Sequence, residues 1–183
     1  MNAVLAPRSA QRPRDPQRER VYQWQDEILP PEETPASIHP RRPFEPWFLE
    51  FHAEAWRYGF ERYGQGGLRS LITATPPELR YSFRLRRAGG HAGLTFGRSG
   101  QLRARITFGQ RGPTRRILLH EQAHLLNHGP HLLSDSEAHG PRFCAIALDL
   151  YERFLGVNHT VAIFAALTHR VRIDLALLEA GGP

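Results

Sequence analysis

Five of the ten histidines of this 183-residue chain lie within twenty consecutive residues, and this cluster constrains the fold more than any other feature. Its centre is the motif His120-Glu121-Gln122-Ala123-His124, inside a segment of helical periodicity from Thr114 to His128. Histidines four positions apart share one face of a helix, so two imidazole nitrogens can bind one metal ion. Glu121 projects about 100° around the helix from His120, where it can reach a metal-bound water. The motif therefore predicts a metal-binding helix that carries its own general base.

A catalytic metal also needs a third protein ligand and an open position for water. The metzincin spacing fails, because its glycine and its third histidine are absent from this sequence. His128 lies one turn further along the same helix, about 6 Å along the axis, which is too far to share the metal comfortably. Glu137 is one remaining candidate. His139 is the better one, because it precedes the turn Gly140-Pro141 and can fold back on the first helix.

The other sequence patterns predict an α+β chain. Helical spacing of apolar residues indicates a helix from Pro46 to Gly64 and a shorter one from Gln17 to Leu29. Apolar and polar residues alternate over three predicted strands, Leu79–Arg86, His91–Phe96 and Gln101–Phe108. Because glycine-rich turns separate these strands, we expect a three-stranded antiparallel sheet.

Two C-terminal helices are expected after the metal-binding helix. One begins after Gly140-Pro141, and the last runs from about His159 to Glu179. The residues of the last helix that we expect to face inward are Val161, Phe164, Ala165, Thr168, Leu175 and Leu178.

Length and composition predict a disordered basic arm over residues 1–16 and a single domain over residues 17–183. The longest apolar run, Val161–Leu167, is far shorter than the ~20 residues of a membrane-spanning helix. The single cysteine, Cys144, cannot form an internal disulfide, and the first twenty residues lack the apolar core of a signal peptide. A cytoplasmic protein with no membrane association is therefore expected.

The basic residues bear on both chemistry and partners. All 24 Lys+Arg positions are arginine, which excludes mechanisms that need a catalytic lysine. The net charge of +6 permits a nucleic-acid partner. The predicted strands would place five arginines on one sheet face: Arg80, Arg84, Arg86, Arg103 and Arg105. Such a face can bind phosphate, but a solvated sheet face is the simpler interpretation.

Two motifs together resemble a known family. The motif from His120 to His124, followed by His139-Gly140-Pro141-Arg142-Phe143, resembles the H-E-x-x-H and H-G-P-x-F pair of SprT-like zincins. The likeness is greatest to a group of short actinobacterial metallohydrolases, whose opening the stretch Arg14–Tyr22 also resembles. It extends from about residue 14 to residue 180, although residues 29–106 match only in the order of their elements.

The resemblance implies a zincin-like fold with one zinc ion per chain. Its ligands would be His120, His124 and His139, and Glu121 would be the general base. Two departures, Leu125 in place of a histidine and Arg142 in place of an acidic residue, leave the substrate preference open. Imidazole ligands also suit iron and manganese, so the native metal stays open as well.

The hypothesis that follows is a zinc-dependent hydrolase, a metallopeptidase acting on a peptide or protein. Glu121 would activate a metal-bound water while the metal polarises the scissile carbonyl. The strand Gln101–Phe108 is a candidate edge for an extended substrate. Candidate electrophilic helpers are His131, Arg142 and Tyr151, and candidate hydrogen-bond partners of the histidines are Asp135, Glu137 and Asp149. The alternative is a basic nucleic-acid-associated module with a structural or regulatory metal. The sequence does not predict the oligomeric state.

Overall fold

The structure is a computed structural model that describes residues 15–31, 44–64, 75–82, 90–96, 102–109, 112–127 and 138–180. Its elements, in chain order, are α1 (Arg18–Ile28), α2 (Pro46–Tyr63), β1 (Glu78–Tyr81), β2 (Gly90–Phe96), β3 (Leu102–Phe108), α3 (Arg115–Asn127), α4 (Pro141–Leu155), α5 (His159–Thr168) and α6 (Leu175–Ala180). The described part is therefore mixed α+β, as predicted. Residues 1–14 of the predicted basic arm lie outside it.

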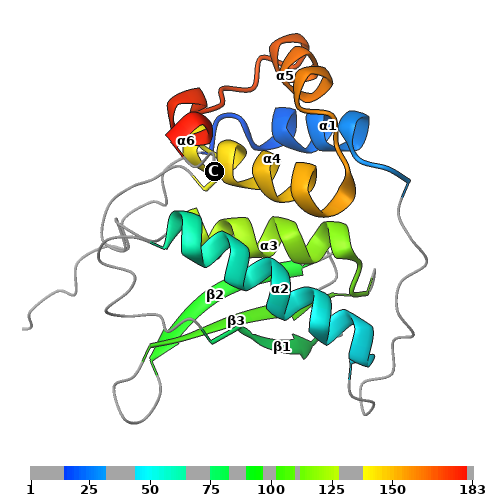
Figure 1. The fold of residues 1–183 in the computed structure, drawn as a ribbon, viewed down its shortest axis with the longest axis vertical. Coiled ribbons are helices and arrows are strands. Elements are labelled where there is room, and N and C mark those ends of the chain that lie inside the picture. Colours follow the sequence, from blue (N-terminus) through cyan, green and yellow to red (C-terminus); the bar gives the residue numbers. More distant parts are fainter. Residues whose placement is uncertain are drawn as a thin grey trace, which may run out of the picture.

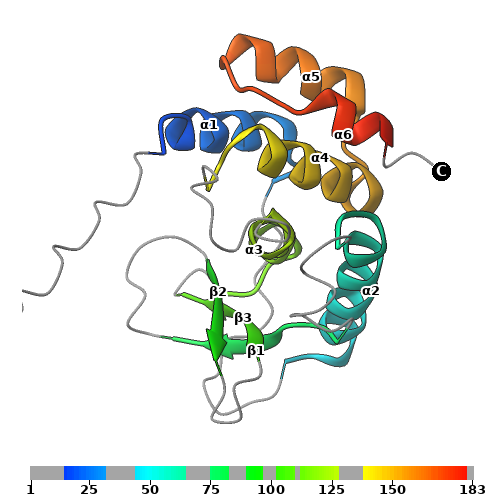
Figure 2. The same ribbon diagram turned by 90° about the vertical axis from the view of Figure 1, so that its left-hand side faces the viewer.

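Helix α3 is the central element of the fold. It packs on β2 and β3 on one side and against α2 and α4 on the others, as Figures 1 and 2 show. Nearly every side chain from Ile117 to Asn127 is consequently buried, including the polar residues His120, Glu121 and Gln122. Buried polar groups need hydrogen-bond partners, so the elements around α3 must provide partners for these side chains.

The first four predicted helices are confirmed, because their periodicity and end signals are local. Pro46 begins α2 and Pro141 begins α4, where a proline loses no helical hydrogen bond. Gly156 ends α4 with φ 68°, a left-handed conformation that favours glycine. None of the described helices is long and apolar enough to cross a membrane.

The prediction of an antiparallel sheet is wrong. The strand order is β1-β3-β2, with β1 parallel to β3 and β2 antiparallel to it. Alternation of apolar residues decides which face of a strand is buried, but it does not decide which strand lies beside it. The eight residues between Tyr81 and Gly90 can span the ~10 Å of two strand spacings, so β1 and β2 need not be neighbours.

The expected substrate edge is wrong for the same reason. Strand β3 is central, and from Arg105 to Phe108 it pairs with β1 on one side and β2 on the other. Its backbone there has no free edge for a substrate. Among the described strands, β2 is the edge strand that packs against α3.

The predicted alternation within the strands is confirmed for β3, whose Ala104, Ile106 and Phe108 are buried. Arginines occupy the opposite face, but they are partly neutralised. The Glu78 carboxylate pairs with Arg80 at 2.7 Å and with Arg105 at 3.0 Å. Arg84 and Arg86 lie outside the described residues. This shared carboxylate favours a solvated face over a phosphate-binding one.

The expected last helix is in fact two helices, α5 and α6. Arg170 adopts φ 54° after α5, and the Asp174 carboxylate accepts the Leu177 N–H at 3.1 Å as α6 begins. An aspartate in this position caps a new helix.

The expected inward face of the last helix is confirmed only in part: Ala165 is buried and Leu178 packs partly buried against the core, but the other expected residues are exposed. Val161 and Phe164 are 60% and 67% exposed, whereas Ala162, Ala165 and Ala166 are buried. Thr168 and, in α6, Leu175 are exposed as well. The small alanine face lets α5 approach α1 closely enough for the Trp24 indole N–H to donate to the Ala162 carbonyl at 2.9 Å. Apolar residues lie on every side of α5, so polarity does not determine which face packs. The face with the smallest side chains, the alanines, is the one that packs against α1.

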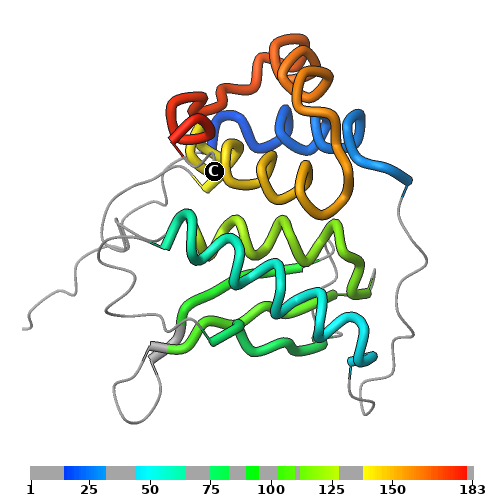
Figure 3. Tube along the Cα trace, viewed as in Figure 1, coloured from blue at the N-terminus to red at the C-terminus, as the bar shows by residue number. Residues whose placement is uncertain are grey.

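Helix α1 lies beside α4; in Figure 3 these are the blue helix and the yellow-to-orange helix. The Gln25 amide of α1 donates to the Tyr151 hydroxyl of α4 at 3.0 Å. Gln17, just before α1, is fully buried and accepts the Arg172 N–H at 3.1 Å. These contacts bring the segment that begins at Asp15 next to α3 and the start of α4.

Candidate metal centre

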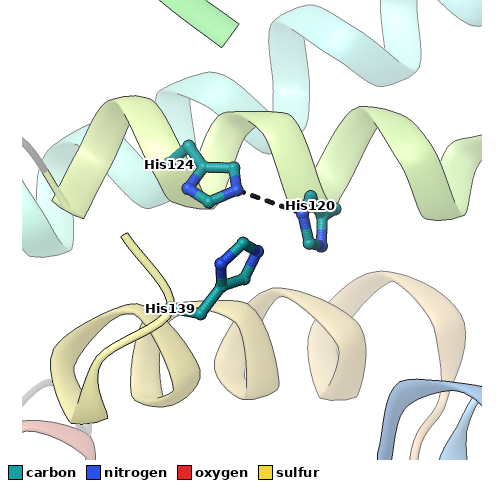
Figure 4. A group of neighbouring side chains, drawn as sticks. All are labelled: His120, His124 and His139. Carbon is teal, nitrogen blue, oxygen red and sulfur yellow. Dashed lines mark hydrogen bonds between the residues drawn. The ribbon is translucent and has the colours of Figure 1, made fainter. Parts of the chain in front are cut away.

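Three histidines from two parts of the chain meet between α3 and α4. His120 and His124 project from α3, and His139 precedes the first turn of α4 (Figure 4). One ligand nitrogen from each of them lies within 4.8 Å of the others. The Nε2 atoms of His120 and His124 are 3.1 Å apart. The structure therefore brings together the three histidines singled out in the sequence, whereas His128, His131 and Glu137 lie outside the described residues.

The H-G-P-x-F motif explains locally how His139 reaches α3. Gly140 is extended and Pro141 starts α4, so the chain turns sharply after the histidine. The Phe143 ring then packs against all three imidazoles, with centroid separations of 5.1 Å to His120, 4.4 Å to His124 and 4.9 Å to His139. The Phe143 ring thus forms an apolar surface beneath the three imidazoles.

The donor set fits a metal ion. His120 and His139 are buried, and burial lowers the pKa of both, that of His120 to about 3. Both imidazoles are therefore neutral at pH 7, the form that binds metals. The Nε2 atom of His139 is buried and has no hydrogen-bond partner in the described part of the chain. A buried acceptor without a partner, facing two further imidazoles, is what a three-histidine site requires.

Two side chains of the N-terminal segment orient these histidines. The Asp15 carboxylate accepts a hydrogen bond from Nδ1 of His139, and the Gln25 amide oxygen accepts one from Nδ1 of His120 at 3.2 Å. A proton held on Nδ1 leaves the Nε2 lone pair of each ring available for a metal. Neither partner could be predicted from the sequence, because no spacing rule links residues 15 and 25 to residues 120 and 139.

Glu121 lies beside the cluster against strand β2. Its carboxylate accepts a hydrogen bond from the backbone N–H of Ala92, and burial raises its pKa to about 7. A methyl group added at Gly90 would lie 2.9 Å from both Cγ and Oε1 of Glu121, so the strand and the side chain are in close contact. A buried carboxyl with a pKa near neutrality can take and return a proton near pH 7.

Gln122, the next residue of the motif, attaches α3 to α2. Its amide donates to Nδ1 of His52 at 2.8 Å and to the His52 carbonyl at 3.1 Å. The other ring nitrogen of His52 bonds the Pro77 carbonyl at 2.9 Å. These buried contacts hold α3 in position without touching the three histidines.

The remaining candidates that lie within the described residues do not join the cluster. Asp149 accepts hydrogen bonds from Tyr58 and Tyr63 and pairs with Arg62, so it links α4 to α2. Tyr151 is fully buried, with its hydroxyl bound to Gln25. The charged neighbour of Arg142 is Asp174. Asp135 lies outside the described residues.

Comparison of the chain with protein-family models, curated proteins and solved structures returned no match.

Replacing Asp15 by asparagine is expected to weaken zinc binding by about 10- to 100-fold, the usual effect of losing a carboxylate that orients a ligand histidine. The amide keeps the shape but carries no charge, so it holds the Nδ1 proton of His139 less strongly. Zinc affinity would be measured by competition with a chromophoric chelator. The matched control is Asp26→Asn, which removes an exposed carboxylate of α1 that pairs with Arg116 of α3. Equal affinity in both variants would contradict the role of Asp15.

Proposed function

We propose that the protein is a zinc-dependent hydrolase, a metallopeptidase of the SprT-like zincin type. One observation carries the proposal: three imidazoles converge within 4.8 Å, and the helix that bears two of them also bears a buried carboxylate next in sequence to His120. A structural metal site has no use for that carboxylate, whereas hydrolysis needs a base beside the metal. Three histidines also leave the fourth position of a tetrahedral zinc for water.

Each residue has a defined task in this proposal. His120, His124 and His139 would hold the metal, which when bound supplies a Lewis acid and makes water more acidic. Glu121 accepts the proton of the attacking water and returns it to the leaving amine. Asp15 and Gln25 keep two imidazoles oriented, and Phe143 excludes water from beneath them.

Strand β2 supports a peptide as the substrate. It is the edge strand beside α3, and its backbone reaches Glu121 through the N–H of Ala92. An extended chain that pairs with an edge strand gains main-chain hydrogen bonds without a sequence requirement. A peptide aligned with β2 would therefore pass close to the general base.

Removal of the metal tests the proposal directly. Zinc-loaded protein is expected to cleave members of a proteome-derived peptide mixture, as detected by mass spectrometry of new termini. Protein stripped with a chelator should produce none of these termini, and one equivalent of zinc should restore them. Cleavage that survives complete stripping would contradict the proposal, and so would a zinc-loaded protein that cleaves nothing in the mixture.

A further inference from the structure

Helix α1 places two hydrogen-bond donors, Arg18 and Tyr22, beside the histidine cluster, and neither has a task in the proposed function. They are one helical turn apart, so they share a face of α1. The Tyr22 ring stacks on His120 with a centroid separation of 5.7 Å and meets His139 edge-on at 5.3 Å. Tyr22 is half-buried and Arg18 is exposed. The side of the cluster that faces α1 therefore has hydrogen-bond donors that water can reach.

The two side chains act as a pair. The Arg18 guanidinium lies 5.6 Å from the centre of the Tyr22 ring, and the two side chains are hydrogen-bonded. Burial is the main cause that lowers the pKa of His120 and of His139, and the Arg18 charge lowers both further, so its field reaches both. A guanidinium on this side of the cluster can donate charge-assisted hydrogen bonds to an anion there.

The chemistry of peptide hydrolysis requires such a group. When water adds to the scissile carbonyl carbon, the C=O π electrons move onto the oxygen, which gains negative charge. Donors aimed at that oxygen in a partly dry site lower the barrier. The two donors named from the sequence that the structure describes do not serve, because Tyr151 is fully buried on Gln25 and Arg142 neighbours Asp174.

We propose that the Tyr22 hydroxyl and the Arg18 guanidinium bind the oxygen that becomes negatively charged during hydrolysis. The proposal rests on the proposed function, since it names the oxyanion-binding residues of the same site. Asp15, which precedes α1, binds His139, so α1 and the residues before it would serve both the metal ligands and the substrate.

Binding of small probes to the zinc-loaded protein tests this proposal without a substrate. Phenylphosphonate presents a tetrahedral anion, whereas imidazole is a neutral metal ligand that needs no oxyanion donor. Calorimetric titration is expected to show that Tyr22→Phe and Arg18→Gln each weaken phosphonate binding about 10- to 100-fold, the effect of losing a hydrogen bond to a charged group. Imidazole binding should stay as in the wild type.

The matched control is Arg20→Gln, which removes a guanidinium of the same helix that bonds the Pro16 carbonyl instead. It should leave phosphonate binding unchanged. Tyr22→Phe and Arg18→Gln proteins that bind phosphonate as the wild type does would overturn the proposal. A wild type that binds imidazole but not phosphonate would overturn it too. Failure of the proposed function is distinguishable, because the zinc-loaded wild type would then cleave no peptide even though its phosphonate binding still depends on Arg18 and Tyr22.

Discussion

Replacing Glu121 by glutamine is expected to lower the rate of hydrolysis about 10²- to 10⁴-fold, the range for loss of a general base. Glutamine has nearly the same shape, so it fits the narrow space against Gly90, where a single added methyl group would lie 2.9 Å from the side chain. Its amide cannot accept a proton from water. The three histidines keep their positions, so we expect zinc content and thermal stability close to those of the wild type.

The measurement is the rate of appearance of new peptide termini for wild type and Glu121→Gln at equal zinc loading. Glu54→Gln is the matched control, because it makes the same chemical change at an exposed site on α2. Its rate should equal that of the wild type. A Glu121→Gln protein with full activity would show that another group takes the proton, and the hydrolytic mechanism proposed for this site would fall.

Replacing His139 by alanine is expected to abolish stoichiometric zinc binding. The wild type should hold one zinc ion per chain after purification without chelator. Loss of one of three direct ligands should reduce affinity by more than the 10- to 100-fold expected for an outer partner such as Asp15. Elemental analysis of the two proteins, prepared side by side, gives the metal content per chain.

His159→Ala is the control for this experiment, because His159 is half-exposed on α5 and pairs with Glu152 away from the cluster. It should retain the full zinc content. An unchanged zinc content in His139→Ala would indicate that the third metal ligand is Glu137 or His128. Absence of zinc from the wild type, even after zinc is added, would instead contradict the zinc-dependent hydrolase and favour a non-catalytic basic module.

The helices could be predicted well because their signals are local. The proline at the start of α2 and the Gly-Pro pair at the start of α4 determine where these helices begin, whatever packs against them. The i, i+4 spacing of His120 and His124 likewise determined that two imidazoles share one face of α3. The motif after His139 pointed to the turn that brings the third histidine back.

The failures involve contacts between distant segments. Period-two alternation in β1 and β3 correctly predicted the buried face, but the parallel pairing of Glu78 with Arg105 depends on the whole sheet. The face of α5 that packs was decided by the fit of its alanines against α1. The partnership of Asp15 with His139 spans 124 residues, and no periodicity reports such a contact.

By itself, the sequence determined which residues can meet a metal: the local geometry of a helix places His120 and His124 together, and a turn follows His139. The tertiary structure alone decided what surrounds them. It buried α3 between the sheet and two helices, which lowers the pKa of His120 and raises that of Glu121 to about 7. It also brought α1 across the cluster with its hydrogen-bond donors and acceptors. The reason is physical: spacing along one helix follows from backbone geometry, whereas burial and long-range hydrogen bonds arise only when the elements pack together.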